Sequence, residues 1–457
     1  MRIRLGVLLA LGLVLGCGDD DGGGGGGDFP AIDCGEVTDT AGCVEISTAE
    51  QLLDEVNLLT GDTTLVLAAG RFDLTNAVTI RADGVHLVGQ GIDTTTLAFS
   101  AATTQFNGVD VVGDGFLVQD LTVLDAPKDG IRVEESDGVT FRRIRATWTN
   151  EGDSENGAYG IYPVKSRNVL VEDSFAENAS DAGLYVGQCQ YVIVRRNTVM
   201  GNVAGLEIEN TQYADVYENT AEDNTGGIVA FDLPGNPIVG RDVRLRDNVI
   251  RNNNRENFAP GGTVGLIPAG TGSFLLASRR IEITNNTYEN NQTVDIAILS
   301  GLVVESDEAM WTTPESELVG DWDDLGLLEG SEAGTRTNFR TEDVVVANNT
   351  HTGSGLTPDT SRELGLIVDL IFQMDRPTPS VIYDTIGESN FDPEDATMNS
   401  NDNRICVGGN GGGDFASIDL ETQSSELVPV LRLGEAPFAP FDCTELEGGP
   451  VDEVTLP

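Results

Sequence analysis

The sequence has little of what metal centres, nucleic-acid binding and helical folds require. Its 457 residues include two histidines, two lysines and six cysteines, and 26 basic residues face 75 acidic ones, giving a formal net charge of −49. Such a chain is repelled by DNA, RNA and anionic lipid. C-x-x-C, P-loop, G-x-S-x-G and EF-hand patterns are missing, which argues against cysteine-based metal sites, NTPases, α/β-hydrolases and EF-hands. We expect no metal site of these kinds, and Ca²⁺ is the one cofactor left open.

Long apolar runs are also scarce, and the one clear case lies at the N-terminus. Residues 1–16 carry two arginines and then about a dozen apolar residues, the layout of a signal peptide. Gly16-Cys17 after Leu-Val-Leu resembles the lipobox of bacterial lipoproteins, which implies a lipidated Cys17 and a lipid-anchored location in the bacterial cell envelope, at the outer membrane, the periplasmic face or the cell surface. Ordinary secretion with loss of Cys17 is the alternative. Residues 17–30 are predicted to form a flexible tether.

The remaining cysteines are consistent with a protein that is exported from the cytoplasm. Cys34 and Cys43 lie close together near one end of the chain, and Cys406 and Cys443 lie close together near the other. Two local pairs of this kind suit an oxidising compartment, so we predict the disulfides Cys34–Cys43 and Cys406–Cys443. Cys189 stands alone inside a repeat and is predicted to be a small core residue.

A glycine followed by an apolar-x-apolar triplet recurs through the middle of the chain. It stands at Gly160, Gly183, Gly205 and Gly227, in steps of 23, 22 and 22 residues, with an earlier copy at Gly130. A second short strand pattern starts nine residues after each of Gly130, Gly160, Gly183 and Gly205. Asparagines recur in the polar turns that follow, at Asn197, Asn219 and Asn248 and at Asn202, Asn224 and Asn253. Units this short cannot bury a face alone and must stack.

A repeat of about 22 residues with two or three short strands is too short for a βαβ crossover and too regular for a sandwich. We therefore predict an all-β protein, a right-handed single-stranded parallel β-helix whose equivalent positions form ladders at a spacing of about 4.8 Å. Turn asparagines are expected to hydrogen-bond along their ladders. The predicted interior ladders are Ile131, Ile161, Leu184, Leu206 and Ile228, and Val133, Pro163, Val186, Ile208 and Ala230.

The ends of a β-helix need caps, because open strand edges would pair with other molecules. Residues 31–75 are predicted to form the N-terminal cap, with a short helix in 47–59. The β-helix is expected over 76–355 with an acidic insertion at about 303–342, and an irregular C-terminal cap is expected over 356–457.

Four segments, "GAYGIYPV" (157–164), "DAGLYVGQC" (181–189), "NVAGLEIEN" (202–210) and "NTGGIVAFDLPG" (224–235), resemble the coils of a family of bacterial parallel β-helix repeat lipoproteins in the pectin-lyase-like superfamily. The resemblance covers about residues 45–350. It implies the β-helical fold. Because the superfamily is dominated by proteins that bind, cleave or epimerise acidic polysaccharides, it also implies, by analogy of fold alone, a polysaccharide partner, which uronates would suit.

The residues between the interior positions point outward and carry the candidate catalytic groups. Tyr162, Tyr185 and Glu207 fall in one outward column, Glu209 lies two residues along from Glu207, and Lys165 flanks them. Two carboxylates below two tyrosines can act as a general acid/base pair or bind a cation, and the rings can stack on sugars. The competing interpretation is that these side chains are an ordinary solvated ladder.

Basic residues are concentrated in the same region. Residues 128–255 hold 14 basic and 20 acidic residues, which is far less acidic than the rest of the chain. Arginine forks there could bind the carboxylates of a polyanion. The candidate substrate-binding residues are Arg132, Arg142, Arg195 and Arg246. Pairing of the arginines with Glu172 between coils is the structural alternative.

The sequence thus predicts a cell-envelope lipoprotein whose β-helix binds an acidic polysaccharide and processes it by lyase, hydrolase or epimerase chemistry. The alternative is a non-catalytic envelope module that binds a protein partner. Nucleic acid is not an expected partner, and the membrane is expected to be contacted only through the lipid anchor.

Overall fold

The computed structural model describes residues 32–320, 331–420, 430–433, 440–446 and 448–457. The predicted signal peptide (1–16), Cys17 and the tether (17–30) lie outside the described residues, as do residues 321–330 of the predicted insertion. Within the described ranges, none of the helices is long and apolar enough to cross a membrane.

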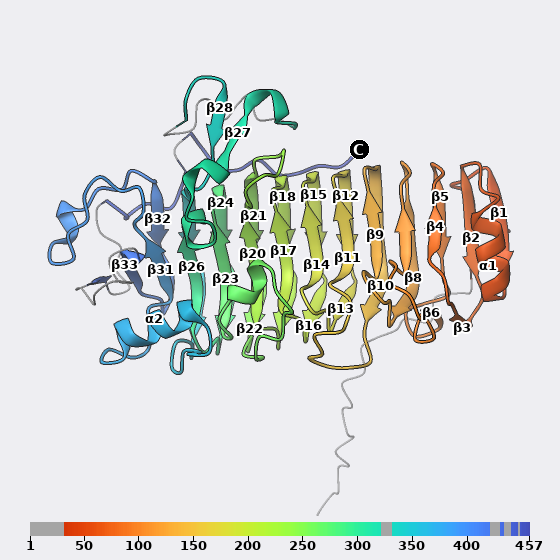
Figure 1. Ribbon diagram of the computed structural model, residues 1–457, viewed down its shortest axis with the longest axis horizontal. Helices are drawn as coiled ribbons and strands as arrows, with labels where there is room; N and C mark the ends of the chain where they lie inside the picture. The colour runs from red at the N-terminus through yellow and green to blue at the C-terminus, as the bar shows by residue number, and fades with distance from the viewer. Residues whose placement is uncertain (1–31, 321–330, 421–429, 434–439, 447) are drawn as a thin grey trace, which may run out of the picture. The chain divides into compact units, whose positions relative to one another are not determined.

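Two large sheets built from parallel strands form the body of residues 32–457 (Figure 1). The first sheet contains β1 (Gly42–Ile46), β2 (Thr63–Leu67), β3 (Gly70–Asp73), β5 (Val85–Val88), β6 (Thr95–Ala98), β8 (Leu117–Leu124), β10 (Asp137–Thr147), β12 (Arg167–Glu172), β13 (Phe175–Glu177), β15 (Gln190–Arg195), β16 (Thr198–Met200), β18 (Gln212–Tyr217), β19 (Thr220–Glu222), β21 (Arg241–Arg246), β22 (Val249–Arg251), β24 (Arg279–Thr284), β25 (Thr287–Glu289), β29 (Glu342–Ala347), β30 (Thr350–Thr352) and β32 (Ile405–Gly408). The second sheet contains β4 (Val78–Ile80), β7 (Val109–Val111), β9 (Ile131–Glu134), β11 (Tyr159–Val164), β14 (Ala182–Gly187), β17 (Ala204–Glu209), β20 (Gly226–Phe231), β23 (Thr271–Leu276), β26 (Val294–Leu299), β31 (Val381–Asp384), β33 (Phe415–Ile418) and the antiparallel β34 (Leu431–Leu433).

Each middle coil has three strands, one from the second sheet followed by a long and a short strand of the first. Strands β14, β15 and β16 form one such coil, and every strand pairs in parallel with its copy in the next coil. Leu184 pairs with Leu206, and Leu206 pairs with Ile228, in the predicted interior register. These three side chains are fully buried, and each contributes about 1.5–3 kcal/mol through burial.

The turn asparagines form two continuous hydrogen-bonded ladders inside the coil. In the first, the Nδ2 of Asn197 donates to the Oδ1 of Asn219 at 3.0 Å, and that of Asn219 donates to Asn248 at 3.0 Å. The Asn219 Nδ2 also donates to the Val194 carbonyl, and its Oδ1 accepts from the Asn197 backbone amide. The second ladder passes from Asn202 through Asn224 and Asn253 to Asn291. The predicted role of these side chains is confirmed.

The ends of the solenoid differ from each other. At the N-terminal end, helix α1 (Ala49–Val56) starts after Thr48, whose side chain accepts from the Gln51 amide, and this is the short helix expected in 47–59. At the C-terminal end, parallel pairing continues past residue 355 through β31, β32 and β33, within the segment expected to be irregular. Those coils lack the glycine-triplet signature, so the sequence pattern did not reveal them.

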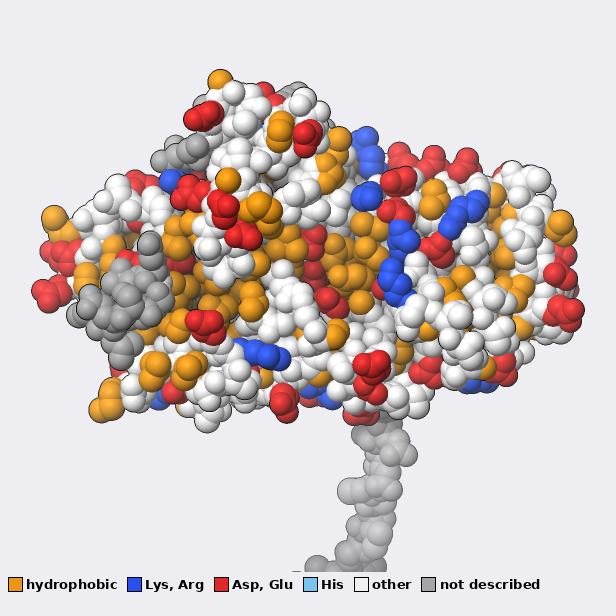
Figure 2. All heavy atoms as spheres, viewed as in Figure 1, with side chains coloured by type: hydrophobic (Ala, Val, Ile, Leu, Met, Phe, Trp, Pro, Cys, Tyr) orange, Lys and Arg blue, Asp and Glu red, His pale blue; other side chains and the backbone are white. Residues whose placement is uncertain are grey.

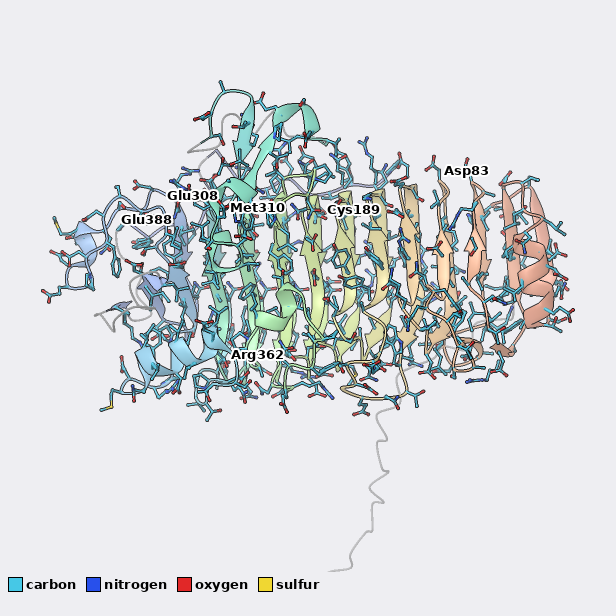
Figure 3. The ribbon with its side chains drawn as sticks, in the orientation of Figure 1. Asp83, Cys189, Glu308, Met310, Arg362 and Glu388 are labelled. Atoms are coloured by element: carbon cyan, nitrogen blue, oxygen red, sulfur yellow. A yellow bond between two sulfur atoms is a disulfide. The ribbon has the colours of Figure 1, made fainter. Side chains whose placement is uncertain are left out.

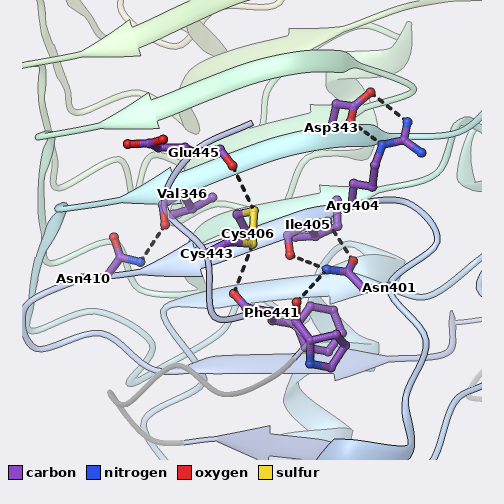
Figure 4. The surroundings of a disulfide bond; sticks show 11 residues. Asp343, Val346, Asn401, Arg404, Ile405, Cys406, Asn410, Phe441, Cys443 and Glu445 are labelled. Atoms are coloured by element: carbon purple, nitrogen blue, oxygen red, sulfur yellow. Dashed lines mark hydrogen bonds and ion pairs between the residues drawn. A yellow bond between two sulfur atoms is a disulfide. The ribbon is translucent and has the colours of Figure 1, made fainter. Parts of the chain in front are cut away.

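Both disulfides are present. Cys34 bonds to Cys43 near the N-terminal end, and Cys406 bonds to Cys443. The second bridge ties the C-terminal segment to β32, next to the place where the Asn410 Nδ2 donates to the Val346 carbonyl at 2.9 Å (Figure 4). Cys189 is buried and free, as expected for a core residue; Figure 3 marks it in the middle of the solenoid.

Several segments leave the coils and pack on the outer face of the second sheet or stand beside it. Helix α2 (Glu363–Phe372) covers the C-terminal part of this face (Figure 1). The insertion begins after β26 and carries the antiparallel hairpin of β27 (Thr312–Pro314) and β28 (Thr335–Thr337), with Glu308 and Met310 marked on it in Figure 3. The short 3₁₀ turns are η1 (Thr263–Leu266), η2 (Gly301–Val303), η3 (Glu308–Trp311), η4 (Glu315–Glu317) and η6 (Ala396–Met398).

Candidate functional site

The candidate site lies on the outer face of the second sheet, over strands β9 to β20. Side chains at alternate positions of each strand point away from the core, and pairing of equivalent residues aligns them across coils. Tyr185 pairs with Glu207, and Glu207 pairs with Val229. On the N-terminal side, Tyr162 pairs with Arg132. The predicted outward column is therefore present in its predicted order.

Three tyrosines form a compact cluster in this column. The ring centroids of Tyr162 and Tyr185 are 4.9 Å apart in an edge-to-face arrangement, and Tyr159 lies 4.6 Å from the first ring and 4.5 Å from the second. Burial raises the pKa of Tyr162 to about 12, so its hydroxyl remains protonated at neutral pH. Sequence reasoning missed Tyr159, although it belongs to the "GAYG" segment and is the first residue of β11, the strand that carries Tyr162.

Two glutamates lie beside the tyrosines, and they are buried. Glu207 is 2% exposed and Glu209 is 8% exposed, so the competing interpretation of a solvated ladder does not hold for these two side chains. Burial, together with the nearby carboxyls of Asp181 and Glu209, raises the pKa of Glu207 well above its ordinary value. Burial raises the pKa of Glu209 to about 7, although hydrogen bonding from Tyr185 and Asn236 acts in the opposite direction.

A third carboxyl belongs to the same cluster. Asp181 stands just before β14, and burial with the charge of Glu209 raises its pKa to about 7. One oxygen of Glu207, Oε2, is buried without a hydrogen-bond partner. Burial thus raises the pKa of all three carboxyls of this cluster, and the pKa values of Asp181 and Glu209 lie close to neutral pH.

A glycine allows the Tyr185 ring to reach the glutamates. Gly187 pairs with Glu209 in the adjacent coil. A Cβ atom on Gly187 would lie 2.3 Å from the Tyr185 ring and 2.4 Å from its hydroxyl oxygen. Any side chain at position 187 would displace the ring, so glycine at this outward position is a requirement of the site.

Irregular segments explain why these outward residues are buried. The loop after β20 brings the Asn236 Nδ2 to 3.0 Å from the Glu209 Oε1. Tyr185 belongs to an apolar cluster that includes Val203, Val264 and Ile267, the last two from the η1 region. Sequence periodicity identifies the column but not the loops that cover it.

Basic side chains flank the N-terminal edge of the site. Figure 2 shows them gathered over β9 and β11, next to an apolar area that contains acidic side chains. The Lys165 Nζ lies 3.2 Å from the Glu134 Oε1, and Arg132 also pairs with Glu134. The Lys165 side chain is 45% exposed. Lys165 and Arg132 are thus at the edge of the cluster, and of the two Lys165 is the more accessible.

The other predicted substrate-binding arginines lie on the first sheet, away from this column. Arg142 and Arg195 both pair with Glu172, at 2.6 and 2.7 Å. Arg246 pairs with Asp215 at 3.0 Å, and its guanidinium carbon lies 3.9 Å from the Tyr217 ring centroid. The structure thus gives these three arginines partners within the first sheet, as the structural alternative expected for Arg142 and Arg195, and it does not bring them to the tyrosines and glutamates.

In the part of the chain that the structure describes, no group of three or more histidine, cysteine, aspartate or glutamate side chains is arranged to hold a metal ion.

Several solved structures are similar to this chain at low sequence identity. No curated protein matches the sequence. Among solved structures, the A-module of the Azotobacter vinelandii mannuronan C-5 epimerase AlgE4 is similar at 14% identity and a TM-score of 0.43, covering 82% of this chain and 96% of that one. A polygalacturonase from Erwinia carotovora is similar at 11% identity and a TM-score of 0.39, covering 72% and 96%. An alginate lyase from Paenibacillus sp. is similar at 12% identity and a TM-score of 0.32, covering 56% and 90%.

A family model described as "Right handed beta helix region" matches residues 107–240 and 154–307. These ranges contain the candidate site and the coils from which the solenoid was predicted. The predicted fold class is confirmed: the chain is a right-handed parallel β-helix.

Proposed function

We propose that the outer face over β11 to β17 binds an acidic polysaccharide, and that Glu207 and Glu209 form an acid/base pair that acts on it. The observation that carries this proposal is the proton-sharing pair itself. Glu207 is buried with one unpartnered oxygen, although native proteins rarely leave buried polar atoms unsatisfied. Such an exception, with pKa values moved towards neutrality, is the pattern expected where proton transfer occurs.

The pair has the protonation states that a two-step proton transfer needs. Near pH 7 one carboxyl group carries a proton and can donate it, while the neighbouring carboxylate can accept one. Cleavage of a glycosidic bond by hydrolysis or elimination, and epimerisation at a uronate carbon, all require removal or delivery of a proton at a sugar. Tyr185, directly beside the pair, keeps its proton because burial raises its pKa, so it donates hydrogen bonds rather than accepting protons.

The surroundings of the pair suit a sugar chain. Aromatic rings stack on the apolar faces of sugars, and three tyrosine rings lie within 5 Å of one another here. The basic edge at Lys165 and Arg132 gives an acidic ligand partners that the strongly acidic remainder of the chain does not offer. A polysaccharide with carboxylates would place them at this edge and a sugar ring over the tyrosines.

A protein partner is the second candidate, and one observation favours it. Helix α2 exposes Leu366 and Leu370, at 41% and 40%, and Met374 just beyond it is 93% exposed. Contiguous exposed apolar side chains are typical of protein interaction sites. Under this candidate the β-helix presents α2 to an envelope protein and has no turnover.

Substitution of Glu207 by glutamine separates the two candidates. A polysaccharide array identifies a ligand of the parent protein, and turnover is followed by ultraviolet absorbance of unsaturated ends, by reducing ends and by a change in uronate composition. We expect Glu207→Gln to abolish turnover while affinity stays within about tenfold. Glu218→Gln, on an exposed turn of the same coil, is the matched control and should retain turnover.

Two results decide against the proposal. If the parent binds no polysaccharide, the face is not a carbohydrate site, and loss of a captured partner in a Leu366→Asp/Leu370→Asp variant would then support the protein-binding candidate. If the parent binds a polysaccharide but neither it nor the glutamine variant changes the polymer, binding stands and the acid/base role falls.

The same proposal places the protein on a membrane through lipid on Cys17. Two or three acyl chains anchor a protein far more strongly than any surface contact of an acidic solenoid. Cys17→Ser should therefore move the protein from the membrane pellet to the soluble fraction after cell fractionation. Unchanged pelleting would contradict the lipid anchor and would leave the polysaccharide site untouched.

A further inference from the structure

We refer to the candidate site of Tyr162, Tyr185, Glu207 and Glu209 as the tyrosine–carboxyl site. A second cluster of chemically active groups lies apart from it, in the C-terminal third of the solenoid. His351 in β30 points into the coil at the position equivalent to Tyr288, and the two rings stack at 5.2 Å and 6°. Its Nδ1 lies 2.9 Å from the Asp295 Oδ2, and both side chains are at most 2% exposed. The Asn291 Nδ2 donates to the other Asp295 oxygen at 2.9 Å.

This hydrogen bond orients the imidazole and leaves one nitrogen without a partner. Asp295 accepts from the Nδ1 N–H, so in the neutral ring Nε2 carries the lone pair and is an acceptor. The Nε2 of His351 is buried and has no hydrogen-bond partner. A buried histidine whose one nitrogen is held by a carboxylate and whose other nitrogen is unsatisfied needs a further partner, since such orphaned groups are costly.

The chain leaves space beside this pair. After β32 it turns through a run of glycines, and a Cβ on Gly413 would lie 2.6 Å from the His351 ring, so the backbone passes close to the imidazole without a side chain between them. A cavity of about 360 Å³ adjoins the pair. This volume is within the range of small-molecule pockets, about 300–1,000 Å³. The cavity is lined by Asp295, His351, Thr352, Gly353, Ser354, Pro377, Thr378, Ser380, Gly412, Asp414 and Arg432.

The charges of the lining are compensated in pairs. The Arg432 Nη2 lies 2.6 Å from the Asp414 Oδ2 and also donates to the Pro377 carbonyl at 2.8 Å. Asp295 is paired with His351. What remains for an occupant is a set of hydroxyl groups, from Thr352, Ser354 and Ser380 among others, together with the imidazole. Such a lining favours a neutral ligand with several hydroxyls over an anion or a metal cation.

We propose that this cavity binds a neutral polyhydroxylated ligand, a single sugar unit or a polyol, with a ligand hydroxyl as the missing partner of His351 Nε2. The site uses none of the residues of the tyrosine–carboxyl site and does not depend on the function proposed there. Asp295 acts through His351 as a positioning residue, since it fixes which ring nitrogen faces the ligand.

The two histidines of the chain make the test direct. In protein labelled at histidine, NMR shows two sets of ring signals, and a His86→Gln variant identifies those of His351. Glucose, galactose, N-acetylglucosamine, glycerol, galacturonate and inorganic phosphate are titrated separately. We expect a neutral sugar or glycerol to shift the His351 signals saturably, with a dissociation constant on the order of 1 mM, while the His86 signals stay in place.

Variants of one strand supply the matched control. Thr352→Trp fills the cavity from an exposed position of β30 and should abolish the shift, whereas Thr350→Trp, equally exposed on the same strand but outside the lining, should preserve it. Thermal unfolding of both variants shows whether they fold alike. Glu207→Gln should leave the shift unchanged, which separates this cavity from the polysaccharide site.

Three results would overturn the proposal. The first is that none of the neutral compounds moves the His351 signals at concentrations up to about 100 mM, a hundredfold above the expected dissociation constant. The second is that galacturonate or phosphate moves them and the neutral compounds do not, which would contradict the argument from compensated charge. The third is that a folded Thr352→Trp protein binds as the parent does.

Discussion

Two buried glutamates in neighbouring parts of the same solenoid have pKa values that are shifted in opposite directions. Glu172, on the first sheet, is 4% exposed, and Glu207, on the second sheet, is 2% exposed. Burial acts to raise the pKa of Glu172, but hydrogen bonds from Arg142 and Arg195 outweigh it and lower the pKa to about 2. The pKa of Glu207 is raised well above its ordinary value.

The difference comes from the adjacent coils rather than from the fold. In the ladder, Glu172 is paired with Arg142 on one side and with Arg195 on the other. Glu207 has Tyr185 on one side and Val229 on the other. Stacking at a fixed spacing gives each outward residue two immediate neighbours, so their identity decides whether a buried carboxylate is charged and structural or protonated and available for chemistry.

The turn asparagines form a third type of ladder in the solenoid. We expect disruption of this ladder to reduce the stability of the fold more than substitution of either glutamate. Asn219→Leu should destabilise the fold by about 3–4 kcal/mol, because it leaves the Val194 carbonyl and groups of two neighbouring asparagines without partners. Urea unfolding measures the change. Asn150→Leu, at an exposed position, is the control and should change stability by less than about 0.5 kcal/mol.

Removal of the charge from the structural glutamate should have the next largest effect. Glu172→Gln leaves Arg142, Arg195 and Arg196 close together without their shared anion. The arginines are partly exposed, so we expect a loss of about 2 kcal/mol rather than the 3–5 kcal/mol of a fully buried pair. The loss should shrink as pH falls from about 4.5 to about 2, because the unfolded chain and then the folded parent become protonated at Glu172. A loss that is independent of pH would mean that shape rather than charge is responsible.

The substitution Glu207→Gln should increase the free energy of unfolding at high pH, in contrast to Glu172→Gln, which should decrease it. Because the pKa values of Glu207 and Glu209 are raised from 4.5, the folded protein holds protons that the unfolded chain releases. The contribution of both carboxyls is complete below about pH 4.5 and decreases above it, and that of Glu209 is lost as pH rises through about 7. Glu207→Gln should therefore be about as stable as the parent at pH 4.5 and about 1–2 kcal/mol more stable at pH 8.

Urea unfolding at the two pH values checks this prediction, with Glu218→Gln as the control that should follow the parent at both. A Glu207→Gln protein that is less stable than the parent at pH 8 would show that the carboxylate has a compensating partner. The contrast with Glu172 would then disappear.

The smallest effect on stability is expected at the exposed edge. The Lys165–Glu134 pair is between partly exposed side chains, and pairs of this kind contribute about 0–1 kcal/mol. Lys165→Ala should change the melting temperature by no more than about 2 °C and should weaken binding of a polyanion, with a stronger effect at low salt. Equal affinity of Lys165→Ala and the parent at low salt would exclude the edge from the binding surface.

The core could be predicted from the repeat, because the interior ladders depend only on the spacing of equivalent residues in the sequence. The glycine-triplet period placed Leu184, Leu206 and Ile228 in one interior ladder, and it placed the turn asparagines in another, without any information about loops. The same spacing gave the outward order of Tyr185 and Glu207. Disulfide partners followed from proximity in sequence.

Burial of the outward column could not be predicted, because its cover has no periodicity. The sequence predicts only that Tyr185 points outward, whereas its ring is 4% exposed and packs in an apolar cluster with Val264 and Ile267. The loop with Asn236 and the η1 turn are irregular segments whose positions depend on contacts far along the chain. For the same reason the surroundings of His351 could not be predicted: Asp295 lies in β26, the glycine turn follows β32, and Arg432 lies in β34.

The insertion between β26 and β29 determines when, during synthesis, the loop over the tyrosines and glutamates receives its supporting contacts. Coils are made from the N-terminus onward during synthesis, and domains fold largely in that direction. The tyrosines and glutamates are complete when β17 has been made, but the loop at 232–240 is braced by later chain: Val319 donates to the Pro237 carbonyl, and the Asn338 Nδ2 lies 3.3 Å from Asp232. The carboxyl cluster and the loop that contacts Glu209 are therefore synthesised before the segment that braces this loop, which follows Asp232 by about a hundred residues.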